Sequence, residues 1–151
     1  MSGKRLHLAL LALLAGIFVW SAVNPHDFFT WLLEVLPAVI GAAILIATFK
    51  RFRFTPLVYT LMAGFMVILM VGGHYTYALA PPGFWMEDVF GFHRNHYDRI
   101  GHFFQGFVPA MISRELLIRK SPLRPGGWLF FLVVCVALAI SASYEFVEWG
   151  M

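Results

Sequence analysis

Five long apolar stretches, separated by short polar segments, form the pattern of this chain. Each stretch is close to the about 20 residues that an α-helix needs to cross the hydrocarbon core of a membrane. The pattern therefore predicts an all-α protein, a polytopic transmembrane helical bundle of about five spanning helices. The stretches cover about residues 6–23, 28–49, 56–77, 98–118 and 127–149.

The segments between these stretches contain residues that stop helices. Asn24-Pro25 is a turn-forming pair that ends the first stretch. The stretch 98–118 is the most polar of the five, and the segment of about 79–97 before it predicts a loop. The first stretch follows Lys4 and Arg5, as a signal peptide would, but no small-residue cleavage site is present, so we expect an uncleaved first helix.

The composition excludes a large soluble domain with a small anchor. Of the 151 residues, 60% are hydrophobic and 13% are charged, whereas soluble domains have about 25% charged residues. We therefore expect residues 1–151 to form a single membrane-embedded helical domain. The single cysteine, Cys135, excludes an intramolecular disulfide and a cysteine-rich metal site.

The basic residues predict the orientation of the chain in the membrane. The net charge is only +3, and the positive charges lie in short loops, so we expect no nucleic-acid partner. Positive clusters fall on alternate ends of successive stretches, so all of them lie on one side of the membrane. Loops that carry positive charges stay on the cytoplasmic side. The N-terminus is therefore expected in the cytoplasm and residue 151 outside. The clusters are Lys4/Arg5, Lys50/Arg51/Arg53 and Arg119/Lys120/Arg124.

Polar side chains from several stretches are expected at one depth near the outer boundary. A rise of about 1.5 Å per residue places His74, His102 and Glu145 roughly 26–27 Å from the positively charged ends of their stretches. Glu34 lies slightly deeper. Because a charged side chain in hydrocarbon costs roughly 2.5–3.5 kcal/mol, such convergence predicts a site. The candidate members are His74, His96, Asp98, His102, Glu145 and Glu148.

One part of this candidate site lies at the start of the fourth stretch. Asp98 and His102 are i,i+4 neighbours on a helix, and Gln105 continues the same face. A carboxylate beside an imidazole orients the ring for general-base work, so His102, Asp98 and Glu145 are our catalytic candidates. Arg94 and Arg99, with Gln105, are candidates for binding a phosphate-bearing substrate. The alternative is that Asp98 and His102 only anchor the start of the helix.

The second part of the candidate site is a glutamate pair. Glu145 and Glu148 are i,i+3, and two close carboxylates repel unless a metal, a proton or a cationic side chain lies between them. Mixed histidine and carboxylate ligands suit zinc, manganese or iron. The metal candidates are His74, His96, His102, Glu145 and Glu148. The alternatives are that Glu148 is solvated and that His74 is structural.

The sequence contains the three runs VGGHYTY (71–77), RNHYDRIGHFFQG (94–106) and SYEFVEW (143–149). Together they resemble the YjdF-type family of bacterial inner-membrane proteins. The resemblance implies a multi-pass protein of the bacterial inner (plasma) membrane and supplies no established reaction. Family members usually continue past the second glutamate to a final helix, so the resemblance implies that this chain lacks a C-terminal loop and helix. The Asp98-x3-His102-Phe103 pattern is more distantly similar to VanZ-like membrane proteins.

The residues leave three functions open. The first is an enzyme or binding protein that acts on a lipid or polyprenyl head group at the outer leaflet, with or without a divalent metal. The second is a small proton-coupled transporter in which Glu34 and Glu145 titrate. The third is a structural membrane protein without catalytic activity. The sequence contains no HExxH, P-loop or GxSxG motif and does not give the oligomeric state.

Overall fold

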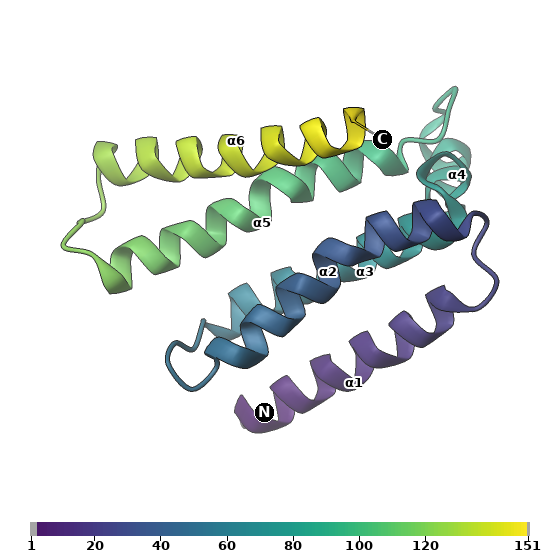
Figure 1. The fold of residues 1–151 in the computed structure, drawn as a ribbon. Coiled ribbons are helices and arrows are strands. Elements are labelled where there is room, and N and C mark those ends of the chain that lie inside the picture. The colour runs from purple at the N-terminus through teal and green to yellow at the C-terminus, as the bar shows by residue number, and fades with distance from the viewer. Residues whose placement is uncertain (1–2, 151) are drawn as a thin grey trace. The chain divides into compact units, whose positions relative to one another are not determined.

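The computed structural model of this protein describes residues 3–150, without the side chains of Val147 and Glu148. Within this part of the chain, the structure has six α-helices and one 3₁₀ helix and no strand, which confirms the all-α prediction (Figure 1). The chain divides into two compact units, Met1–Gly101 and His102–Met151. The single-domain organisation stays a prediction.

The first unit is built around three long helices, α1 (Gly3–Ala22), α2 (Phe28–Thr48) and α3 (Pro56–Tyr75). Helix α3 packs against both α1 and α2, and successive helices run in opposite directions (Figure 1). Helix α2 begins after Asp27, whose carboxylate accepts the Thr30 backbone N–H at 2.7 Å. This hydrogen bond to the charged carboxylate lowers the pKa of Asp27 and stabilises the helix end.

The core of the first unit lies between α2 and α3. Its buried members recur at intervals of three and four residues, which places them on one face of each helix. Helix α1 adds half-buried side chains such as Leu14 and Phe18, and its outward residues, such as Leu13 and Val19, are apolar and exposed. Such an apolar outer surface fits a bilayer, which solvates it. The buried members are Trp31, Val35, Ala38, Met66, Leu69 and Met70.

The segment after α3 is helical, so the prediction of a loop over residues 79–97 is wrong for most of its length. It contains the 3₁₀ helix η1 (Tyr77–Leu79) and the helix α4 (Pro81–Phe90). Pro81 stands in the first turn of α4, where its missing N–H is no loss. Gly91, in the left-handed conformation with φ 67°, ends the helix.

The second unit is a helical hairpin. Helix α5 (Tyr97–Lys120) continues into it from the first unit, and α6 (Gly127–Trp149) returns beside α5 in the opposite direction (Figure 1). Of the five predicted spans, four are long and apolar enough to cross a membrane within the described residues. The exception is α5, because it holds six charged residues, Asp98, Arg99, Arg114, Glu115, Arg119 and Lys120.

Candidate functional site

The structure brings His102 and Glu145 together. His102 is in α5 and Glu145 is in α6, and the His102 Nδ1 lies 3.1 Å from the Glu145 Oε1. Their side chains are 43% and 50% exposed, so both can meet a ligand. A carboxylate oxygen can only accept, so the ring donates its Nδ1–H to Glu145 whether it is neutral or protonated. The two residues form an acid–base pair, and their assignment as catalytic residues stays a prediction.

Gln105 fixes the position of this pair. Its Nε2 donates to the Glu145 Oε1 at 3.3 Å and also reaches the carbonyl oxygen and hydroxyl of Ser141, at 3.3 and 3.4 Å. His102 and Gln105 are i,i+3 on α5, and Ser141 and Glu145 are i,i+4 on α6, so each pair lies on one helix face. Gln105 is only 7% exposed, whereas the pair that it orients is accessible. We call these four residues, His102, Gln105, Ser141 and Glu145, the His–Glu cluster.

His74 lies in the first unit and bonds to α1. A ring nitrogen, Nδ1, lies 3.0 Å from the backbone oxygen of Ser21, and the ring contacts Trp20 and Tyr75. Because a carbonyl oxygen accepts only, Nδ1 carries the hydrogen. This bond ties the end of α3 to the end of α1, which is the structural role that the sequence left open for His74.

The residues that precede α5, or lie in its first turn, have different environments. Arg94, Asp98 and Arg99 are exposed. His96 is half-buried, with its ring edge-on to Phe92 at 4.8 Å. The predicted substrate-binding roles of Arg94 and Arg99, and the catalytic role of Asp98, stay predictions.

The proposed metal ligands do not form a site within the described residues. No group of three or more His, Cys, Asp or Glu side chains in that part of the chain is arranged to hold a metal ion. His74 is bonded to α1, and His102 and Glu145 approach each other as a pair. The prediction for Glu148 falls on a side chain outside the described part. The groups that the structure does bring together, His102, Glu145 and Gln105, can exchange protons and hydrogen bonds with a ligand.

The sequence reasoning missed the role of Tyr77. Its hydroxyl donates to the Glu34 Oε2 at 3.1 Å, which gives the deep carboxylate of α2 a partner. Its ring lies against two glycines: a Cβ at Gly72 would be 2.6 Å from the ring, and one at Gly101 would be 2.9 Å from it. The spacing of the two glycines in the sequence does not predict this contact, because the ring that lies against them belongs to a residue of η1.

Asn95 has a similar positioning role at the start of α5. Its Nδ2 donates to the carbonyl of Ala80 at 2.9 Å, and its Oδ1 accepts the Tyr97 N–H at 2.9 Å. The amide lies so close to Gly83 that a Cβ there would be 1.6 Å from the Asn95 Oδ1. Tyr97 is buried and donates its hydroxyl to the backbone oxygen of Ile68 at 3.1 Å. These bonds join α3, α4 and the first turn of α5.

Comparison with known proteins identifies relatives of the whole chain. The family described as "Predicted membrane protein (DUF2238)" matches residues 6–151. The curated relative "Inner membrane protein YjdF" of Escherichia coli (strain K12) is 50% identical over 133 residues, which are 88% of this chain and 64% of the relative. The chain therefore spans less than two thirds of that relative. No solved structure matches. The YjdF-type resemblance is confirmed, and the VanZ-like one finds no support here.

Proposed function

Because the chain belongs to the DUF2238 family of predicted membrane proteins, we propose that it is an inner-membrane protein that binds the phosphate-bearing head group of a lipid or polyprenyl carrier. The observation that carries this proposal is the 3.1 Å approach of the His102 Nδ1 to the Glu145 Oε1. The curated relative from Escherichia coli carries "Inner membrane protein" in its name, which supports the location.

The His–Glu cluster supplies a directed donor and acceptor. With Nδ1–H donated to Glu145, the Nε2 of a neutral ring is an acceptor that can take a proton from a substrate hydroxyl or phosphate. When the ring is protonated, the same atom donates a charge-assisted hydrogen bond to a phosphate oxygen. Gln105 holds the carboxylate and so maintains the orientation of the ring. Arg99, which precedes His102 by one helical turn, is the candidate for neutralising the phosphate.

The surroundings of the cluster favour an amphiphilic substrate over a soluble one. Several exposed residues of α6 are aromatic or aliphatic, among them Phe130, Leu138 and Phe146. Phe103 and Phe107 of α5 are also exposed. In a membrane these side chains face acyl chains, whereas the polar cluster lies near the end of α6. A ligand with a polar head group and an apolar tail matches both surfaces.

The test is binding of a polyprenyl phosphate and of the matching uncharged polyprenol to the purified chain in detergent, measured by native mass spectrometry. We expect binding of the phosphate and a loss of about tenfold in affinity, equivalent to about 1.4 kcal/mol, for each of His102→Ala and Glu145→Gln. Ser143→Ala is the matched control, because its hydroxyl donates to the carbonyl of Ala139 in the same helix. Ser141→Ala, within the cluster, should weaken binding less than either main variant.

Three outcomes would contradict the proposal. Equal binding of the alcohol and the phosphate would exclude head-group recognition. Unchanged binding in both main variants would place any site elsewhere. Lower thermal stability of these variants with no binding by the wild type would identify the His–Glu cluster as a helix-to-helix contact, the structural alternative. Proton-coupled flux in liposomes that is lost in Glu34→Gln would favour the transporter instead.

A further inference from the structure

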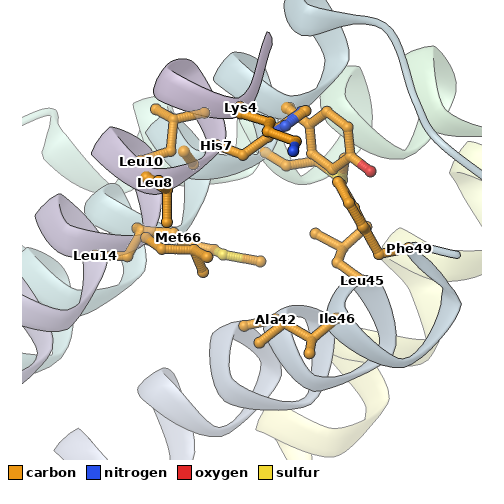
Figure 2. Close-up of a pocket in the computed structure, with 14 residues that line it drawn as sticks. Lys4, His7, Leu8, Leu10, Leu14, Ala42, Leu45, Ile46, Phe49 and Met66 are labelled. Carbon is orange, nitrogen blue, oxygen red and sulfur yellow. The ribbon is translucent and has the colours of Figure 1, made fainter.

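A cavity lies between α1, α2 and α3 of the first unit, and none of its lining residues belongs to the His–Glu cluster. Its volume is about 380 Å³, within the range of ligand pockets. Figure 2 shows side chains from all three helices around it, with aliphatic groups along most of the wall. The apolar wall includes Leu11, Leu14, Ala42, Leu45, Met62 and Met66.

The polar groups of the cavity gather at one end. Lys4 and His7 of α1 lie there (Figure 2), and the His7 ring packs edge-on against Phe49 at 5.1 Å and Tyr59 at 4.7 Å. The guanidinium of Arg53 lies 4.9 Å from the centre of the Phe49 ring. This end is therefore positively charged and aromatic, whereas the remainder of the cavity is apolar.

Tyr59 places an unpaired polar group beside the cavity. The residue lines the cavity and is only 9% exposed, and its hydroxyl is buried without a hydrogen-bond partner within the described part of the chain. A buried hydroxyl that makes no hydrogen bond is unfavourable by about 1–3 kcal/mol. The hydroxyl does not touch open space in this structure, so a ligand oxygen reaches it only if the ring shifts toward the polar end of the cavity.

We propose that this cavity holds one acyl chain of an anionic phospholipid from the leaflet at the Lys4 end of the bundle. From Lys4 to Leu14 the cavity follows ten residues of α1, or about 15 Å along the helix axis. This is half of the about 30 Å hydrocarbon core, the depth of one leaflet. The phosphate end meets Lys4, and the Tyr59 hydroxyl donates to an oxygen of the head group or of the ester. By the positive-inside rule this leaflet is the cytoplasmic one.

The experiment compares phosphatidylglycerol with phosphatidylcholine of identical acyl chains, added to the delipidated full chain in detergent and followed by native mass spectrometry. We expect retention of one phosphatidylglycerol molecule and at least about fivefold weaker retention of phosphatidylcholine, because only the former has a net negative charge. Ala42→Phe fills the cavity and should abolish retention. Ala43→Phe is its matched control, because Ala43 is exposed and lies outside the cavity.

Tyr59→Phe gives an independent readout if Ala42→Phe fails to fold. Removal of the hydroxyl should leave the lipid-free thermal midpoint unchanged or raised, and it should reduce the rise that phosphatidylglycerol produces. Equal retention of the two lipids, or full retention in folded Ala42→Phe, would overturn the proposal. A lipid-free midpoint that falls in Tyr59→Phe would also overturn it, because the hydroxyl would then have a partner within the protein.

Discussion

His96 has an environment that disfavours its charged form. The ring is half-buried before α5, and its Nδ1 is buried without a hydrogen-bond partner in the described part of the chain. Burial lowers the pKa of His96, and the positive charges of Arg99 and Arg94 lower it further. The folded chain therefore holds this ring neutral at pH values at which an unfolded chain protonates it.

This difference predicts a pH-dependent stability. Between the ordinary histidine pKa of about 6.5 and the lower folded value, the unfolded state binds the additional proton, so stability falls as the pH falls through this window. His96→Gln should lose part of the decrease in thermal midpoint between about pH 7 and pH 5. His26→Gln, at an exposed position, is the control. Parallel curves of thermal midpoint against pH for the wild type and His96→Gln would contradict this account.

At the scale of elements, the ring of Tyr77 joins three helices of the first unit. It lies between Gly72 of α3 and Gly101 in the early part of α5, and its hydroxyl bonds to Glu34 of α2. Thr76 before it has φ 63° and ψ 146°, a conformation that β-branched residues rarely adopt. The backbone strain at Thr76 thus occurs where the chain turns from α3 to place the ring.

Gly72→Ala should therefore destabilise the chain. The new methyl group would lie 2.6 Å from the Tyr77 ring, and overpacking of this kind typically costs about 1–3 kcal/mol. Gly64→Ala on the same helix is the matched control, because no atom lies within 4 Å of its Cβ position. Thermal unfolding in detergent should show a lower midpoint for Gly72→Ala and an unchanged or raised one for Gly64→Ala. Equal midpoints would show that the ring can move away.

The sequence predicted the long helices because each has a continuous apolar run bounded by turn residues. Helix α4 was missed, because its ten residues contain Pro81, Pro82 and Gly83, which are typical of a loop when no partner is known. Here both prolines fall in the first turn, and Gly83 gives space to the Asn95 amide. The space that Gly83 gives to Asn95 depends on a contact between two segments of the chain, which the sequence spacing does not reveal.

The candidate site was predictable within each helix and not between helices. The i,i+3 spacing of His102 and Gln105 places them on one face of α5. Whether Glu145 of α6 stands opposite that face depends on how the two helices align, and the structure shows that it does. The grouping of His74 with this site was an inference from depth alone, and its bond to Ser21 had no signal in the sequence.

At the scale of the whole molecule, the charged residues of α5 bear on the topology. Glu115 is buried and pairs with Arg119 one turn later, so two of the six charges are mutually neutralised. Gln105, near the start of α5, bonds to Ser141, near the end of α6, so the two helices are antiparallel along most of their length. If α6 crosses the membrane, α5 beside it covers the same depth.

We therefore expect five crossings, with the N-terminus in the cytoplasm and the end of α6 outside. Alkaline phosphatase fused after His26 or after Gly150 should be active, and the same reporter fused after Arg124 should be inactive, because positively charged loops stay inside. A cytoplasmic reporter, green fluorescent protein, fused at the same positions should give the opposite pattern. Inactive phosphatase at Gly150 would show that one helix does not cross.

The Tyr77 ring also limits how the family can vary. Because residues 72 and 101 both contact the ring, neither position can accept a larger side chain unless position 77 becomes smaller, and an aliphatic residue at 77 would leave Glu34 without the phenol. Substitutions at positions 34, 72, 77 and 101 should therefore be correlated among relatives. In an alignment of the family, these four positions would covary even though positions 34 and 101 are far from 72 and 77 along the chain.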